Sequence, residues 1–296
     1  MSSSSRNHAL PLALGLCAAA VCAALPAATS RAEPPARSAS SRSGAVNMDQ
    51  LRRILDGETI TERAAGKEPD YTDEFFIEEC RFTAGGRNPW FSLRPGYQLY
   101  LAGHDKGDFI ELYITVLDEF RDICFTKSEG RNICVKTRVV EEREFINGQL
   151  YEVSRNYYAR CRQTNDVMYF GEDVCFYDRQ GNCVSTEGSW LAGVNGAMPG
   201  VIMPGSFMLG ARYFQEIAPG VAEDRAENVE MDLDITVPAG TFDDCVVVLE
   251  TSPLDPGAED EKVYARGVGL VMDAELELVS YGFLPGFDSD PGNAGE

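Results

Sequence analysis

The stretch FIELYITVLD, which runs from Phe109 to Asp118, decides the fold class of this chain. Its residues alternate between the two faces of an extended strand. One face carries Ile110, Leu112, Ile114 and Val116, and the other carries Glu111, Tyr113 and Thr115. A period of two over this length predicts a β-strand with one face in a core and one wetter face.

Similar strands are expected on both sides of this stretch. Between residues 97 and 187 they are separated by the turn signals Asn147-Gly148, Thr164-Asn165-Asp166 and Asp178 to Gly181. After residue 210 the pattern returns, and it is cleanest from Asn228 to Val237. Roughly ten or eleven strands joined by tight turns predict an all-β antiparallel meander, and a sheet of that width must twist and curl. We expect a strongly curved sheet, a half-barrel or a barrel, whose concave face is open to a ligand.

The two ends of the chain differ in composition from this β-rich part. Residues 1–32 combine Arg6 with an apolar run and with small residues near position 32, which predicts a cleaved export signal. Residues 33–46 are rich in Pro, Ser, Ala and Arg and predict a flexible linker. A single domain is expected over residues 47–287, with a short helix from Asn47 to Gly57 at its start and a polar tail at 288–296.

The chain is strongly acidic, with a formal net charge of −21. Nucleic acids and anionic membrane surfaces are therefore poor partners. No stable membrane insertion is expected once the signal is removed, and the predicted location is the periplasm or the extracellular space. A solubilising surface in such a compartment accounts for the charge without a store of bound cations.

Seven cysteines lie beyond the predicted signal, and in an oxidising compartment most of them should be bridged. Two pairs flank turn signals and are predicted disulfides, namely Cys124 with Cys134 and Cys175 with Cys183. In the second pair, a change of register by one residue would make the two cysteines diagonal neighbours. No partner is assigned to Cys80, Cys161 and Cys245. Because no Cys-x-x-Cys spacing occurs, no metal site is predicted.

The usual catalytic groups are sparse. His104 is the only histidine beyond the predicted signal, and no Gly-x-Ser-x-Gly motif or phosphate-binding glycine pattern accompanies it. No catalytic residue and no cofactor is therefore predicted. A glycosidase would need two carboxyl groups across a cleft, and the nominated pairs are Glu172 with Asp173 and Glu216 with Asp224.

Two acidic connections, Pro219 to Glu227 and Pro253 to Glu261, carry carboxylates that could bind calcium. Neither has the Asp-x-Asp-x-Asp-Gly spacing with a distal glutamate that a calcium loop uses. Solvated loops are the favoured interpretation.

The segment from Gly188 to Gly210 is the largest anomaly, because it is long, glycine-rich and apolar at once. Loops of this kind are often lids or self-packed loops, so it is expected either to cover a ligand on the concave face or to fill the mouth of a barrel itself. The residues predicted to grip an apolar ligand are Trp190, Met198, Met203, Phe207 and Tyr213. Asn195 and Glu216 are predicted to orient its polar end.

Three strings resemble an uncharacterised family of exported bacterial β-rich proteins: YFGEDV at 169–174, GSWLAG at 188–193 and VPAGTF at 237–242. The likeness covers about Phe91 to Gly282. It implies a curved antiparallel sheet similar to the half-barrels that carry lipoproteins or other lipids in the periplasm. It implies no catalytic residue.

The expected function is non-enzymatic binding of an apolar or amphipathic ligand, such as a lipid or another apolar small molecule, inside the curved sheet. Two alternatives stay open. One is a carboxylate-dependent hydrolase of cell-envelope glycans, and the other is a purely structural envelope protein, for which the sheet interior would be packed solid.

Overall fold

The structure is a computed structural model that describes residues 70–126 and 130–287. The predicted signal, linker, N-terminal helix and C-terminal tail lie outside the described residues. The described residues are almost entirely β-structure, which confirms the predicted fold class.

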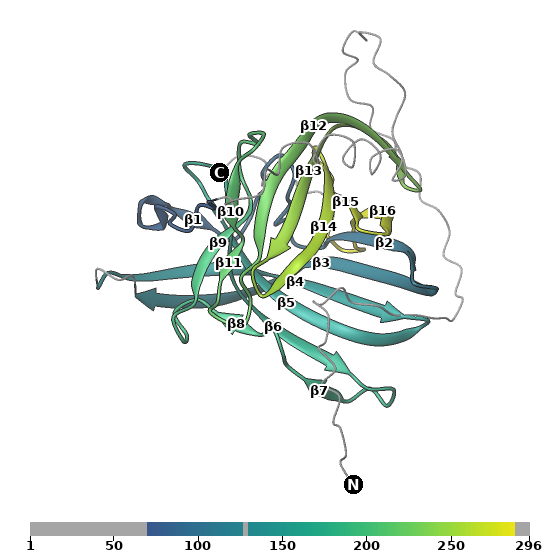
Figure 1. Ribbon diagram of the computed structural model, residues 1–296, viewed down its shortest axis with the longest axis horizontal. Helices are drawn as coiled ribbons and strands as arrows, with labels where there is room; N and C mark the ends of the chain where they lie inside the picture. The colour runs from purple at the N-terminus through teal and green to yellow at the C-terminus, as the bar shows by residue number, and fades with distance from the viewer. Residues whose placement is uncertain (1–69, 127–129, 288–296) are drawn as a thin grey trace.

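Seventeen elements follow one another within the described residues. They are η2 (Ile77–Glu79), β1 (Phe82–Thr83), β2 (Tyr97–Asp105), β3 (Asp108–Thr126), β4 (Asn132–Ile146), β5 (Gln149–Cys161), β6 (Val167–Tyr177), β7 (Cys183–Ser185), β8 (Trp190–Leu191), β9 (Met198–Met203), β10 (Arg212–Phe214), β11 (Glu216–Ile217), β12 (Arg225–Val237), β13 (Gly240–Ser252), β14 (Asp255–Ala265), β15 (Gly269–Asp273) and β16 (Leu276–Phe283). Successive long strands pair with each other, as expected for a meander (Figure 1).

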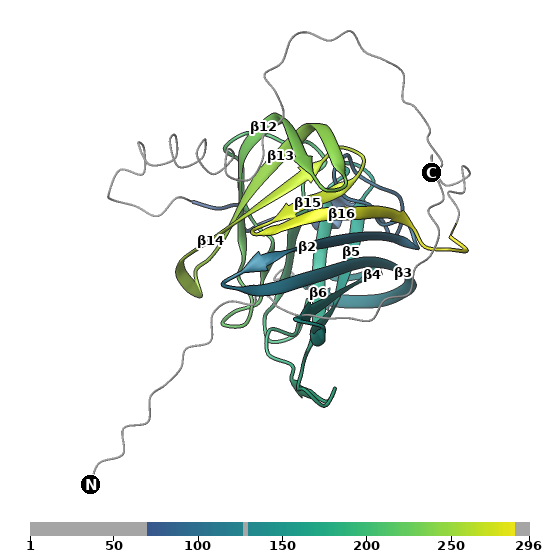
Figure 2. The ribbon, with the colours of Figure 1, turned by 90° about the vertical axis from the view of Figure 1, so that its right-hand side faces the viewer.

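The sheet curls until its two ends almost meet. Its strand order is β10-β12-β13-β14-β15-β16-β2-β3-β4-β5-β6-β9-β11. The two end strands, β10 and β11, are separated in the chain only by Gln215. The chain thus bridges the seam itself, and the result is a nearly closed antiparallel barrel (Figure 2).

Tight turns set the register of the long strands. Asn147 and Gly148 both have positive φ, 47° and 86°, at the turn between β4 and β5. Lys106 and Gly107 do the same between β2 and β3, with φ of 49° and 100°. Two-residue loops with positive φ match the twist of paired strands, so the turn signals in the sequence fix which side chains face inward.

The segment from Gly188 to Gly210 is part of the wall of the barrel, since it contains β8 and β9. β8 pairs with β6, and β9 pairs with both β6 and β11. Met203 at the end of β9 is fully buried. A long segment with this much apolar surface gains more by completing the sheet, where its backbone groups are hydrogen-bonded, than by lying free over it.

The loop that connects β1 to β2 lies at one end of the barrel cavity described below. A loop at residues 84–96, here called the Trp90 loop, buries Leu93 completely and packs Trp90 at 5.7 Å from the Phe207 ring. Its backbone is anchored because Asn88 Nδ2 donates to the carbonyl oxygens of Met203 and Pro204, each at 3.2 Å.

Three disulfides tie the wall together. Cys124 and Cys134 stand directly opposite each other on β3 and β4. Cys175 and Cys183 are bridged as diagonal neighbours, since Cys183 stands opposite Tyr177. The third bridge joins Cys80 to Cys161 and holds the N-terminal segment on β5, while Cys245 is free and buried. Three such bonds suggest a non-cytoplasmic, oxidising compartment.

Among the helices of the described residues, none has the length and apolar character needed to cross a membrane.

The seam at Gln215 yields a first prediction. A Cβ atom on Gly200 would collide with the carbonyl oxygens of Phe214 and Gln215, while Gly85 has open space around it. Gly200→Ala should therefore push β9 away from the seam and lower the free energy of unfolding by about 2 kcal/mol. Gly85→Ala is the matched control, with an expected change within about 0.5 kcal/mol. Urea unfolding of both variants and of the unmodified protein tests this prediction. Equal unfolding midpoints for the two variants would contradict a tight seam.

Candidate functional site

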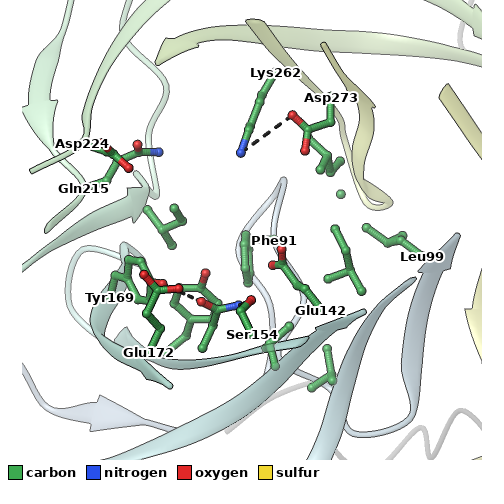
Figure 3. Close-up of a pocket in the computed structure, with 18 of the residues that line it drawn as sticks. Phe91, Leu99, Glu142, Ser154, Tyr169, Glu172, Gln215, Asp224, Lys262 and Asp273 are labelled. Carbon is green, nitrogen blue, oxygen red and sulfur yellow. Dashed lines mark hydrogen bonds and ion pairs between the residues drawn. The ribbon is translucent and has the colours of Figure 1, made fainter. Parts of the chain in front are cut away.

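The interior of the barrel is not filled by its own side chains. A cavity of about 270 Å³ lies along it, and a second one of about 170 Å³ adjoins it. The two share seven lining residues, namely Glu142, Glu152, Ser154, Asp224, Glu250, Lys262 and Asp273. They therefore form one continuous space, which we call the barrel cavity (Figure 3).

The walls of the barrel cavity change character along its length. On β5 the lining residues run from Tyr158 through Asn156 and Ser154 to Glu152. β4 and β14 change in the same direction, from Val140 to Glu142 and Glu144 and from Tyr264 to Lys262 and Asp260. Because alternate residues of a strand share a face, each strand presents an apolar or aromatic end and an acidic end.

Aromatic and aliphatic side chains line one end, which we call the apolar end. The Trp90 loop supplies Trp90 and Phe91, and the strands and the turn before β15 supply Tyr97, Leu99, Ile114, Val116, Val268 and Leu270. The indole Nε1 of Trp90 is buried and has no hydrogen-bond partner in the part of the chain that the structure describes. This end suits the apolar body of a small molecule.

Carboxyl groups dominate the other end, which we call the acidic end. Ten acidic residues line the barrel cavity: Glu142, Glu144, Glu152, Glu172, Glu187, Glu216, Asp224, Glu250, Asp260 and Asp273. Among the described lining residues the one basic side chain is Lys262. Glu187 is exposed, so the cavity reaches the surface near the turn before β8.

Lys262 forms ion pairs with two of these carboxylates. Its Nζ lies 3.0 Å from Glu250 Oε2 and 3.8 Å from Asp273 Oδ1. Burial by itself would lower the pKa of Lys262, but the carboxylates of Asp273 and Glu250 raise it well above its ordinary value. Figure 3 shows Lys262 and Glu142 pointing into the same space from opposite walls.

Two more carboxyl groups, those of Glu216 and Asp224, lie together at the seam of the sheet. The backbone N–H of Asp224 donates to Glu216 Oε1 at 3.1 Å, and the two side chains are also hydrogen-bonded to each other. Burial, with the carboxylate of Asp224 beside it, raises the pKa of Glu216 well above its ordinary value. Gln215, the residue before Glu216, donates from Nε2 to Glu250 Oε1 at 2.5 Å. The residue that bridges the seam thus also orders the acidic wall.

A hydrogen-bonded chain orders the middle of the cavity. The Tyr169 hydroxyl donates to Asn156 Oδ1 at 2.5 Å, and Asn156 Nδ2 donates to Ser154 Oγ at 3.1 Å. Tyr169 is also hydrogen-bonded to the carboxyl group of Glu172. Fixed polar groups of this kind are typical of ligand sites that exist before the ligand arrives.

Burial shifts the titration of the acidic end into the neutral range. It raises the pKa of Glu142 and Glu152 to about 7, that of Glu172 to about 8 and that of Glu144 to about 9. Neighbouring carboxyl groups add to the effect, as Glu152 does for Glu144. Near neutral pH the empty cavity therefore holds several of its carboxyl groups in the protonated form.

The residues predicted to grip a ligand are only partly brought to this cavity. Glu216 lines it, and the segment from Gly188 to Gly210 contributes Gly188 and Ile202. Trp190 instead packs edge-on against Tyr169, with ring centroids 5.2 Å apart, and the Tyr213 hydroxyl donates to Asn228 Oδ1 at 3.0 Å. The other four do not line the cavity: Asn195, Met198, Met203 and Phe207. Their role in contacting a ligand on the concave face stays a prediction.

Of the two acid pairs considered for a glycosidase, the carboxyl groups of one come together in the cavity and those of the other do not. Glu172 lines the cavity, but its neighbour Asp173 points outward and pairs with Arg121 at 2.5 Å. Adjacent residues of a strand face opposite sides, so this pair was a wrong nomination. Glu216 and Asp224 do come together, although eight residues separate them.

Sequence reasoning missed most of the acidic end. Glu142 and Glu144 share a strand face with Val140, and this period-two relation is visible in the sequence. The convergence of β4, β5, β13, β14 and β15 on one space is not visible there. No group of three or more metal-ligating side chains is placed to hold a metal ion within residues 70–126 and 130–287.

The raised pKa values predict a pH dependence of stability for the empty protein. In the unfolded chain a glutamate has a pKa of about 4.3. At a pH above that value, the folded protein therefore binds more protons than the unfolded protein does. Its free energy of unfolding should therefore fall as the pH rises from about 5 to about 9, by up to about 1.4 kcal/mol per pH unit for each such group. Glu144→Gln should flatten this slope and raise stability at pH 8. Urea unfolding across this range, with Glu277→Gln as a control outside the cavity, tests it, and a rising curve would contradict it.

Comparison with known proteins adds no functional assignment to this geometry. The resemblance seen in the three sequence strings stays a prediction, and the function has to be argued from the barrel cavity itself. No protein-family model, no curated protein and no solved structure matches the chain.

Proposed function

We propose that this protein is an exported binding protein that holds a small amphipathic molecule inside its barrel and does no chemistry on it. The observation that carries the proposal is the barrel cavity with one apolar end and one acidic end, closed by the Trp90 loop at the apolar end. A solid interior would have favoured a structural role. Export rests on the predicted signal at residues 1–32 and agrees with the oxidising compartment that the disulfides suggest.

The size of the cavity limits the ligand. Sites for drug-sized molecules are commonly about 300 to 1,000 Å³, so a space of about 270 Å³ with a smaller annex suits a compact molecule or one short chain. Large lipids with two long chains fit less well.

One observation favours a second candidate, a carboxylate-dependent hydrolase. Glu216 and Asp224 both line the cavity and lie beside each other, and burial raises the pKa of both, as it does for the acids of some hydrolases. Such an enzyme should cleave one member of a panel of cell-envelope glycans and lose several orders of magnitude in rate in Glu216→Gln. The binding proposal expects no cleavage by the unmodified protein.

Filling the cavity should abolish binding. Ser154 is buried and lines both parts of the cavity, so Ser154→Phe should weaken the binding of a hydrophobic fluorescent probe at least tenfold. Ser280→Phe places the same ring at an exposed position of β16 and is the control. Probe titrations, with circular dichroism to check folding, make the comparison. The proposal fails if the unmodified protein binds no probe, or if native mass spectrometry of protein purified from its own compartment shows nothing bound.

A further inference from the structure

The acidic end carries more carboxyl groups than the described basic side chains can pair with. Of the ten acidic residues that line the barrel cavity, only Glu250 and Asp273 have a basic partner there, and both share Lys262. Glu142 faces the same space from the opposite wall (Figure 3). An anionic or carboxylate-bearing ligand would add charge of the same sign, which a buried site disfavours strongly.

A second observation points to a hydrogen-bond donor that the protein does not supply. Glu144 is only 9% exposed and lines the acidic end, yet its Oε1 has no hydrogen-bond partner among the described residues. Leaving a buried acceptor without a donor costs about 1 to 3 kcal/mol. A ligand group with several N–H donors would remove this cost, whereas an ether, an ester or a hydrocarbon would not.

A metal ion is a poor candidate for this role. Calcium needs six to eight oxygen ligands gathered around one point. The acidic side chains come from five strands and the seam, and within the described residues no three of them are arranged around a common centre. The other end of the cavity is aromatic and aliphatic, which serves an organic body and not a hydrated ion.

We propose that the ligand is a protonated organic amine, whose ammonium group lies among the carboxylates near Glu144 and whose apolar body lies on the side of Leu99 and Ile114, which are level with Glu142 in the sheet. This inference deepens the proposed function and rests on it. The ammonium donates hydrogen bonds to Glu144 and to the carboxylates beside it. A quaternary ammonium ion lacks these donors and therefore fits less well.

Binding of such an amine releases protons. The groups that face Glu144 from the surrounding strands are Glu142 on β4, Glu152 on β5, Glu250 on β13, Asp260 and Lys262 on β14 and Asp273 on β15, with Asp224 from the seam. Several of these carboxyl groups are protonated in the empty cavity and must ionise to pair with the ammonium. Affinity should therefore rise between about pH 6 and pH 9, while an alkylamine itself stays charged up to about pH 10.

Three probes with the same phenylethyl body and different polar ends separate the effect of charge from that of the apolar body. Isothermal titration calorimetry of the full mature chain at pH 8 compares 2-phenylethylamine, 2-phenylethanol and 3-phenylpropionate. The amine should bind at least tenfold more tightly than the alcohol, and the carboxylate should not bind. Repeating the amine titration in two buffers with different ionisation enthalpies should show net proton release.

Matched variants assign the effect to the acidic end. Glu144→Gln and Glu152→Gln should each weaken amine binding at least tenfold and leave the alcohol unchanged, whereas Glu277→Gln, outside the cavity, should change neither. Equal binding of amine and alcohol, an equal loss of both in Glu144→Gln, or displacement of the amine by calcium at equal concentration would overturn the inference. If the alcohol and a hydrophobic probe still bind in those cases, binding in the barrel stands and only the amine is wrong. If none of them binds, both proposals fail.

Discussion

The backbone pairing that brings the two ends of the sheet to either side of Gln215 is the constraint on which the molecule depends. β11 is held by β9, and β10 is held by β12, so one residue bridges the seam. Gly200 allows this approach because its missing Cβ leaves room for the carbonyl oxygens of Phe214 and Gln215. If the seam opened, the acidic wall would lose Glu216 and Asp224, and the interior would be exposed to water.

A closed sheet of this width encloses more space than its inward side chains fill. In a protein selected for stability alone, that space would hold aliphatic side chains. Here one half of it is lined by carboxyl groups whose burial raises their pKa values. Each such group destabilises the barrel as the pH rises, and the proposed binding role accounts for this cost.

Much of the fold was predictable because strand periodicity and turn chemistry are local properties. The alternation in Phe109–Asp118 and the Asn147-Gly148 turn define β3 and the β4–β5 hairpin correctly. Two of the three disulfides followed from cysteines that flank turns, but the Cys80–Cys161 bridge joins segments whose contact depends on tertiary structure.

The site was less predictable because it is made from residues far apart in the chain. Glu144, Asp224 and Lys262 meet only after the sheet has closed. Composition drew attention instead to the apolar segment from Gly188 to Gly210, which the structure uses mainly as wall. Charged residues on a strand face look solvent-exposed in a sequence, and only closure turns that face inward.

The pairing of β16 with β2 has a consequence for how the chain becomes folded. These strands join residues 276–283 to residues 97–105, although most other neighbours in the sheet are also neighbours in sequence. Until the last strand has been synthesised, β2 remains an unprotected edge that can pair with another chain. Contacts this distant in sequence form slowly, so truncation before β16 would leave an aggregation-prone meander and not a smaller barrel.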